Sequence, residues 1–307
     1  MTTTIGPAVE KYFTAGDGTK LRLCEEGAPD APITLVLVHG WTLSSEIWDR
    51  VVPAVTTASE VRVLRYDLRG HGDSDAAPAG AASVARCADD LAELIAERVP
   101  TGPVVLAGHS MGGMTIMALA ERHPELFAER VAAAALVATS SGDLVAPPLG
   151  LPRPVARTVH RGELLVRAQL AEARGKRVSK YPAPLRPGMR WLLFGSRPQR
   201  RDIAATARWV ADCNPANMAA FRASLAEHER THALAALRNI PVVVLAGLAD
   251  RLCPLPHARR IADALPDAEL LLYAGAGHML PLERTEEVAD RITELLDTAA
   301  RSLVARS

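Results

Sequence analysis

The chain has 307 residues, of which 49% are hydrophobic and 23% are charged, so it can bury a large core without disulfides or metal, and intrinsic disorder as its main state is excluded. Lysine and arginine together number 35, and so do aspartate and glutamate. Because this balance leaves no overall basic field to hold a phosphate backbone or an anionic membrane, we expect no nucleic-acid partner.

Short apolar runs rich in valine and leucine, each bounded by turn residues, predict buried strands. In chain order these runs are 33–38, 61–66, 104–107, 131–138, 242–246 and 270–273. Residues 20–25 predict an early hairpin strand at the sheet edge, and helix-length patterns cover 85–99, 111–122 and 283–300. Since strands alternate with helices, we predict an α/β fold whose mostly parallel sheet has helices on both faces.

One long segment interrupts this alternation. Residues 142–236, here called the insertion, contain clustered prolines and helical patches but no strand-like run. The insertion has 16 basic and 7 acidic residues, so it carries about +9 and the rest of the chain about −9. We predict a core domain made of 1–141 and 237–307 and a helical domain made of 142–236.

The cysteines are far apart and form no C-x-x-C pair, which indicates neither a disulfide framework nor a thiolate metal site: Cys24, Cys87, Cys213 and Cys253. We interpret them as free thiols and expect a reducing, cytoplasmic location. Residues 1–13 include Glu10 and Lys11 ahead of any apolar run, so no signal peptide is predicted. No apolar stretch reaches 18 residues, so no membrane span is expected.

The clearest chemical signal follows the run 104–107. Gly108-His109-Ser110-Met111-Gly112 matches G-x-S-x-G, and a helical pattern begins directly after it. This strand, turn and helix context is what a nucleophile elbow requires, because glycines on both sides permit the tight turn that exposes the serine hydroxyl. The bare pattern arises by chance too often to convince, so its position is what favours a nucleophilic Ser110 over a plain glycine-rich turn.

A nucleophilic serine needs a base, and the base needs an acid that fixes its tautomer. In a parallel sheet these partners are expected just beyond the carboxyl ends of later strands. Asp250 follows the run 242–246, and His278 follows the run 270–273 after four residues of glycine and alanine. The chain order of nucleophile, acid and base is the one that the elbow motif predicts. Asp143, after the run 131–138, is the alternative acid.

Two backbone N–H groups are candidates for the oxyanion hole. The N–H of Met111 lies directly after the nucleophile, and the second candidate is the N–H of Trp41 in the loop that follows the run 33–38. In that same loop His39 is an alternative base. A histidine before a glycine at a strand end is more often a hydrogen-bond partner that fixes the loop.

These residues resemble the α/β-hydrolase family, and in particular its serine esterases and lipases. The resemblance runs from about residue 20 to 300 apart from the insertion, and it rests on 39–41 (HGW), 67–74 (DLRGHGDS), 108–112 (GHSMG), Asp250 and His278. It implies that the insertion is a lid or cap over the serine. It also implies that the stretch 67–74 buttresses the site, with Arg69 and His71 in structural roles.

A second motif competes with this one. His228-Glu229-Arg230-Thr231-His232 matches H-E-x-x-H, in which two histidines on one helical face bind zinc. No third ligand follows at the usual spacing, so we interpret the motif as the polar face of a cap helix and expect no metal. No nucleotide-binding glycine motif occurs, so no cofactor is expected. A serine at the elbow argues against the aspartate chemistry of haloalkane dehalogenases and epoxide hydrolases.

The sequence therefore predicts a serine hydrolase that cleaves a carboxylic ester or related acyl compound through an acyl-enzyme. Within the same fold the alternatives are a thioesterase, a carbon–carbon bond hydrolase and a cofactor-free perhydrolase, which shares the His-Gly-Trp loop but is usually nearly capless. A ligand receptor that hydrolyses slowly is the alternative from another class. The expected partner is a small, apolar acyl substrate.

Large apolar side chains of the insertion, together with Trp41, are candidates for the acyl pocket. The alternative, which the sequence favours equally, is that these side chains serve only to dock the insertion on the core. The candidates within the insertion are Met189, Trp191, Leu192, Phe194, Trp209, Met218 and Phe221.

Overall fold

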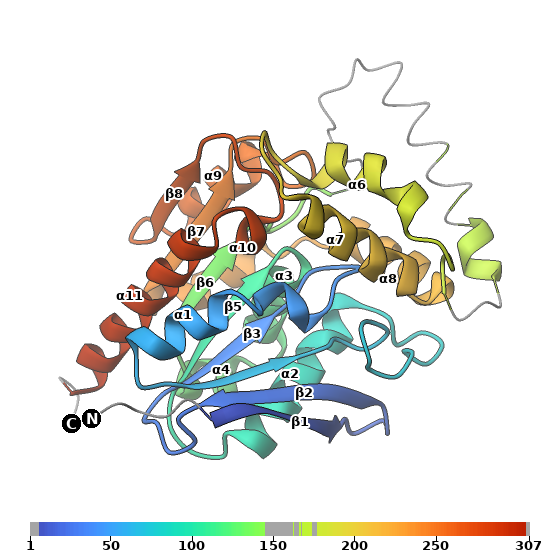
Figure 1. The fold of residues 1–307 in the computed structure, drawn as a ribbon. Helices are drawn as coiled ribbons and strands as arrows, with labels where there is room; N and C mark the ends of the chain where they lie inside the picture. The colour runs from blue at the N-terminus through green and yellow to red at the C-terminus, as the bar shows by residue number, and fades with distance from the viewer. Residues whose placement is uncertain (1–5, 145–161, 163–165, 167, 174–176, 305–307) are drawn as a thin grey trace.

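The structure is a computed structural model that describes residues 6–144, 162, 166, 168–173 and 177–304. Its centre is a sheet with the strand order β1-β2-β4-β3-β5-β6-β7-β8 (Figure 1). The first three strands in this order pair antiparallel, and all later pairs are parallel. The strands are β1 (Gly6–Thr14), β2 (Lys20–Gly27), β3 (Thr34–Val38), β4 (Arg62–Tyr66), β5 (Val104–His109), β6 (Val131–Val137), β7 (Val242–Gly247) and β8 (Glu269–Tyr273).

The N-terminal strands correct one prediction. The expected hairpin strand forms as β2, but it lies between β1 and β4, and β1 is the edge strand. The sequence pattern missed β1 because this strand has no apolar run: in its second half Phe13 is buried while Lys11 and Tyr12 are exposed. An edge strand of this kind is held by backbone pairing with β2 and needs few apolar side chains.

Helices cover both faces of the sheet, as predicted. On one face, α1 and α11 pack together, and α11 contacts β5, β6 and β7. On the other face, α2 packs on α3, α3 lies on β5, and α9 lies on β7 and β8. Two separate clusters of buried apolar residues fill these two layers. The helices are α1 (Val51–Ala58), α2 (Val84–Arg98), α3 (Met111–Arg122), α4 (Pro124–Arg130), α9 (Leu255–Ala264), α10 (Leu280–Glu283) and α11 (Thr285–Val304).

The amphipathic pattern of α2 gives a helix with one buried side. Leu91, Leu94 and Ile95 are fully buried, as their spacing of three and four residues predicts. Ser83 caps the helix, and its side chain accepts a hydrogen bond from the N–H of Arg86. The predicted closing helix is longer than expected and divided, because the chain forms the short α10 before α11 begins at Thr285.

Between β6 and β7 the described residues of the insertion form helices and no strand. Figure 1 shows α6, α7 and α8 grouped at one end of the molecule. Residues 145–161, 163–165, 167 and 174–176 of the insertion lie outside the described residues. The elements are η2 (Ala183–Leu185), α6 (Arg186–Leu193), α7 (Arg200–Asp212), α8 (Pro215–Ala226) and η3 (Thr231–Asn239), with η1 (Ser45–Trp48) below them in the core.

All four cysteines are buried and unpaired. Among the described residues, no helix combines the length and apolar character needed to cross a bilayer. The same part of the chain contains no metal-binding arrangement of three or more histidine, cysteine, aspartate or glutamate side chains.

The helix α3 packs so closely on β3 that Gly112 has no room for a side chain. A Cβ at this position would overlap the carbonyl oxygen of Val38, a backbone atom of the central strand. We therefore expect Gly112→Ala to lower the free energy of unfolding by about 1–3 kcal/mol, measured by urea denaturation. Gly188→Ala is the control, because a Cβ on Gly188 of α6 meets nothing within 4 Å. That variant is expected to be neutral or stabilising by up to about 1 kcal/mol.

Candidate active site

Ser110 occupies the sharp turn between β5 and α3. Its backbone has φ 54° and ψ −117°, a left-handed conformation that is costly for a residue with a side chain. The backbone is held by hydrogen bonds from the Ser110 N–H to Val137 O (2.9 Å) and from the Thr139 hydroxyl to Ser110 O (2.6 Å). A Cβ on Gly108 would lie within 2.5 Å of the backbone of Gly112 and Gly113. The sequence thus forms the strained elbow that the motif predicts.

Asp250 and His278 meet beyond the ends of β7 and β8. The His278 Nδ1–H donates to Asp250 Oδ2 at 2.7 Å, and both side chains are almost completely buried. The other carboxylate oxygen, Oδ1, accepts from the N–H groups of Leu252 (2.8 Å) and Cys253 (2.9 Å). Burial raises the pKa of Asp250, but the charge and hydrogen bond of His278 together with these N–H groups outweigh it and lower the pKa below its ordinary value.

Ser110 and His278 line the same cavity, which has a volume of about 250 Å³. The described structure has no hydrogen bond between the Ser110 hydroxyl and His278, so direct contact between these two groups remains a prediction. Nucleophile and base are often farther apart in an empty site than in the complex with substrate. The alternative acid, Asp143, is exposed and lies beyond β6. Burial lowers the pKa of His257, and the charge of Asp143 opposes that shift.

The cavity wall is almost entirely apolar. Trp41 and Leu43 come from the loop after β3, and Met114 comes from α3. Among the described lining residues, Arg222 and His278 are the side chains that can carry positive charge. The remaining members of the wall are Thr42, Leu144, Met189, Leu192, Leu193, Val210, Met218, Leu225, Leu252 and Cys253.

The two candidate oxyanion N–H groups lie near the nucleophile. Met111 is the first residue of α3, and the first N–H groups of a helix have no acceptor within the helix. The loop that carries Trp41 packs directly on the elbow, since a Cβ on Gly40 would lie 3.0 Å from Ser110 Cβ. Thr42 has φ 62°, so the chain turns sharply after Trp41. The assignment of these two N–H groups to the oxyanion hole remains a prediction.

Two buried histidines hold the loops around the site. The His39 Nδ1 lies 2.7 Å from Gly40 O, and its Nε2 accepts from the N–H of Leu68 at 2.9 Å. Both ring nitrogens are thus engaged with backbone, which fits the loop-fixing interpretation of His39 rather than a catalytic one. His109 was not singled out from the sequence as a functional residue. Its Nε2 lies 2.8 Å from the carbonyl oxygen of His278, so the elbow itself braces the backbone of the candidate base.

The stretch 67–74 is built of buried ion pairs and hydrogen bonds. Arg69 is fully buried between Asp17 and Asp90, and Asp67 accepts from the N–H groups of Ser45 and Asp73. None of these groups lines the cavity. A buttressing role for this stretch, which the family resemblance implies, is consistent with these contacts.

The H-E-x-x-H segment is not part of one helix, which corrects that prediction: its first three residues lie outside any helix, and Thr231 and His232 begin the 3₁₀ helix η3. The helix α8 ends at Ala226, and residues 228–230 are irregular. His228 is buried with its Nε2 3.1 Å from Ser140 O, whereas His232 is exposed and pairs with Glu121. The two histidines therefore have separate partners and do not share one face. The motif marks a junction between the insertion and the core.

The predicted acyl-pocket residues divide into two groups. Trp41, Met189, Leu192 and Met218 line the cavity. The others do not, which corrects the prediction for them: Trp191 is exposed with Arg251 over its ring, Phe194 is buried in the core cluster with Trp209, and Phe221 packs on His71. Trp209 also donates its indole N–H to Glu46 at 3.0 Å. These aromatic side chains dock the insertion on the core.

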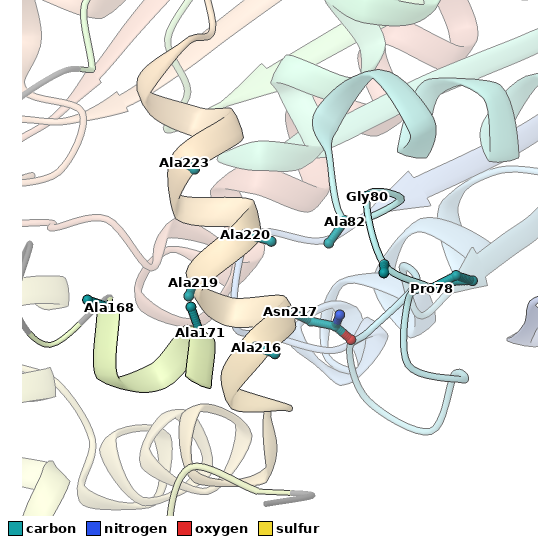
Figure 2. A pocket seen from close by; sticks show the side chains of 11 residues that line it. Pro78, Gly80, Ala82, Ala168, Ala171, Ala216, Asn217, Ala219, Ala220 and Ala223 are labelled. Carbon is teal, nitrogen blue, oxygen red and sulfur yellow. The ribbon is translucent and has the colours of Figure 1, made fainter. Parts of the chain in front are cut away.

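A second cavity, of about 490 Å³, lies between α8 and the segment that precedes α2. Figure 2 shows its wall, in which Ala220 of α8 points toward Ala82 and Ala219 lies beside Ala171. Asn217 is the polar residue among the described lining residues, and its amide bonds both the N–H and the carbonyl of Ala77. With no titratable or nucleophilic group in the described wall, this cavity offers no chemistry.

Known proteins agree with this architecture. The profile described as the alpha/beta hydrolase family matches residues 35–291. The chain belongs to the alpha/beta hydrolase family. This α/β hydrolase is 28% identical over 268 residues to a pimeloyl-[acyl-carrier protein] methyl ester esterase of Aromatoleum aromaticum, a match that covers 85% of this chain and 97% of that one.

Two further proteins resemble this chain, one over nearly its whole length and one over about a third of it. A thermophilic esterase from Thermogutta terrifontis has a solved structure that superposes with a TM-score of 0.74 at 27% identity and covers 96% of this α/β hydrolase and 99% of the esterase. A stretch of 109 residues is 38% identical to the "Probable oxidoreductase EphD" of Mycobacterium tuberculosis. That stretch is 35% of this chain and 18% of the relative, so the chain spans less than a fifth of that protein.

The buried histidines make stability depend on pH. Burial lowers the pKa of His39 and His228 to about 4 and the pKa of His71 and His109 to about 3, from an ordinary value of about 6.5. Between pH 6.5 and 4 the unfolded chain therefore binds more protons than the folded one. We expect the free energy of unfolding to fall as pH falls through this window, by up to about 1.4 kcal/mol per pH unit for each histidine.

Urea denaturation at pH 7.5, 6.5, 5.5 and 5.0 measures this dependence. The variant His71→Gln is expected to show a shallower slope, because it removes one group that takes up a proton on unfolding. A free energy of unfolding that stays constant from pH 6.5 to 5.0 would show that the four histidines are not held neutral.

Proposed function

We propose that the protein is a serine hydrolase that cleaves a carboxylic ester through an acyl-enzyme intermediate. The observation that carries this proposal is the buried hydrogen bond between His278 and Asp250 in the wall of a cavity that Ser110 also lines. The ester-cleaving activity named for the relative of Aromatoleum aromaticum supports it. A base with its partner carboxylate, a strained serine and an apolar cavity are the parts that acyl transfer needs.

The proposed reaction begins when the Ser110 oxygen attacks the substrate carbonyl while His278 Nε2 takes the hydroxyl proton. Met111 and Trp41 donate their N–H groups to the oxyanion that forms. The intermediate collapses, the bond to the alcohol oxygen breaks, and His278 returns its proton to the leaving alcohol. A water molecule then repeats the sequence on the acyl-enzyme and releases the acid. These steps require no cofactor.

Asp250 has two tasks in this scheme. It keeps the His278 proton on Nδ1, so that Nε2 is a free acceptor, and it stabilises the imidazolium that forms when Ser110 loses its proton. The lowered pKa of Asp250 means that the carboxylate is ionised at neutral pH despite its burial. Its second oxygen is occupied by two backbone N–H groups, so the carboxylate cannot rotate away from His278.

The insertion acts as the cap of this site in our proposal. Its helix α6 contributes Met189, Leu192 and Leu193 to the cavity wall, and α8 contributes Met218. Flexible methionine and leucine side chains suit an apolar acyl group and leave room for variation in its shape. The four unpaired cysteines support a reducing, cytoplasmic setting.

Removing the nucleophile is the direct test of the proposal. Ser110→Ala is expected to abolish labelling by a fluorophosphonate probe and to lower kcat for ester hydrolysis by a factor on the order of 10⁴ to 10⁶. Ser140→Ala is the matched control: this serine also contacts a histidine, His257, at 2.8 Å, but it is fully buried and does not line the cavity. It should label as wild type does.

The substrate series for both variants runs from p-nitrophenyl acetate to palmitate and includes an acyl-CoA, a vinylogous diketone and an ester with added hydrogen peroxide. Faster turnover of one of the last three would replace the ester assignment by a thioesterase, a carbon–carbon bond hydrolase or a perhydrolase. Undiminished labelling of the Ser110 variant would refute the serine mechanism itself.

The environment of Asp250 gives a second prediction. In Asp250→Asn the amide oxygen is expected to stay with the N–H groups of Leu252 and Cys253, which turns the NH₂ group toward His278 Nδ1. The ring must then carry its proton on Nε2, where it cannot accept the proton of Ser110. We expect kcat/KM to fall by about 10³ to 10⁴ with little loss of stability. Asp143→Asn should retain wild-type kcat/KM, and the opposite pattern would make Asp143 the acid.

A further inference from the structure

The loop that carries His278 is bound to the insertion, in addition to its bond with Asp250. Residues 193–196, which join α6 to α7, lie against residues 275–278. The His278 N–H donates to Leu193 O at 2.8 Å, and the Ser196 N–H donates to Gly275 O at 2.8 Å. The candidate base thus shares a backbone hydrogen bond with the last residue of the helix that forms part of the cavity wall.

Two glycines make this contact a close one. A Cβ on Gly195 would overlap the carbonyl oxygen of Gly275, and a Cβ on Gly277 would lie 2.6 Å from Gly195 N. Both residues are buried. The two segments therefore pack backbone against backbone with no side chain between them. Because protein interiors are close-packed, a shift of one segment moves the other.

The carboxylate of Glu283 joins the same two segments. Its Oε2 accepts from the N–H of Gly195 at 2.8 Å, and its Oε1 accepts from the N–H of Gly277 at 2.9 Å. Glu283 comes from α10, so three parts of the chain meet at one side chain. A charged acceptor makes stronger hydrogen bonds than a neutral one, and each oxygen of this carboxylate serves a different segment.

We propose that Glu283 is a positioning residue that couples the location of α6 to the location of the His278 ring. This inference rests on the function proposed above, in which His278 is the base. An acyl group in the cavity contacts Met189, Leu192 and Leu193 of α6. Through Leu193 O and the Glu283 bridge, the position that α6 takes around this group fixes the distance between His278 Nε2 and the Ser110 hydroxyl.

The coupling bears on the contact between His278 and Ser110. The described structure has the His278–Asp250 hydrogen bond but none between His278 and Ser110. Asp250 thus orients the ring of the candidate base, which makes no hydrogen bond to the candidate nucleophile. A small displacement of the 275–278 loop is enough to make or break such a contact, and an error of about 1 Å in the placement of a catalytic group costs about 100-fold in rate. Glu283 limits this displacement because its carboxylate holds the N–H of Gly277, the residue directly before His278.

The test compares Glu283→Gln with Glu287→Gln. A glutamine at 283 keeps one acceptor oxygen and replaces the other by an NH₂ group, which meets a backbone N–H and cannot accept from it. Glu287 lies in the first turn of α11 and is half exposed, and Arg284 is its only ion-pair partner among the described residues, at 3.7 Å. The two variants thus make the same chemical change with and without loss of the bridge.

We measure kcat and KM per active site, with active sites counted by the burst of p-nitrophenol. For Glu283→Gln we expect kcat per active site to fall about 10- to 100-fold while KM changes less than about threefold, since the apolar wall is intact. Glu287→Gln should match wild type. Glu283→Asp, which keeps two acceptor oxygens on a shorter side chain, should lie between Glu283→Gln and wild type. A variant that only loses active molecules, with unchanged kcat per site, would overturn the proposal.

Amide hydrogen exchange gives a reading that does not need activity. The His278 N–H, which bonds Leu193 O, is expected to exchange at least tenfold faster in Glu283→Gln than in Glu287→Gln. Equal exchange in the two variants would overturn the role of Glu283 even if wild type is an active hydrolase. Conversely, an inactive wild type that fails to label at Ser110 would refute the proposed function, and the exchange rates would still decide whether Glu283 holds the histidine loop.

Discussion

The hydrogen bond between Asp250 and His278 is the constraint around which the candidate site is arranged. A carboxylate removed from water must have its oxygens occupied by donors. Asp250 meets this requirement with two N–H groups of its own loop and one from His278. Because all three donors lie within the turns that follow β7 and β8, the pair fixes those turns relative to each other. The adjacent, parallel pairing of β7 and β8 is what places the turns side by side.

The nucleophile is fixed by a different physical means. Ser110 sits in a strained backbone conformation that persists because α3 packs backbone to backbone on β3 and β5 at glycine positions. One strand, β6, separates β5 from β7, so the serine and the acid come from strands that do not touch. His109 spans this interval, since it is the last residue of β5 and its ring nitrogen contacts the carbonyl of His278. The elbow and the histidine loop are thereby held by each other as well as by the sheet.

The core of this arrangement was predictable from sequence because its signals are local. The strands β3, β5 and β7 are buried along their whole length, so they appear as continuous apolar runs bounded by turns, and the residues that follow them fall at one edge of a parallel sheet. The edge strand β1 gave no such run because few of its described side chains are buried and its pairing comes from the backbone. The separate surroundings of His228 and His232 could not be predicted either, since a spacing of four residues does not indicate where a helix ends.

The wall of the cavity was only partly predictable, for a related reason. Met189, Leu192 and Leu193 fall on the inner side of α6, but whether a large side chain enters a cavity or docks one layer on another depends on contacts between distant segments. Trp209 illustrates this: its ring belongs to a buried cluster with core residues, and its N–H is taken by Glu46 of η1. The roles of His109 and Glu283 also depend on tertiary contacts, because their partners are backbone atoms that carry no sequence signal.

Several polar contacts attach the insertion to the core, and they differ in how directly they reach the candidate catalytic residues. Arg50 pairs with Asp202 at 2.8 Å, Arg208 with Glu46, and Asn217 bonds the backbone of Ala77. Only one of the two ion pairs follows the overall segregation of charge: Arg208 of the insertion meets an acidic core residue, whereas Asp202 of the insertion meets a basic one. Partly exposed pairs of this kind each contribute little to stability, and none of them touches a candidate catalytic group. The contact at Leu193 and Gly195 differs because it ends on the backbone of His278. Movement of the insertion is therefore passed directly to the backbone of the candidate base through the loop between β8 and α10.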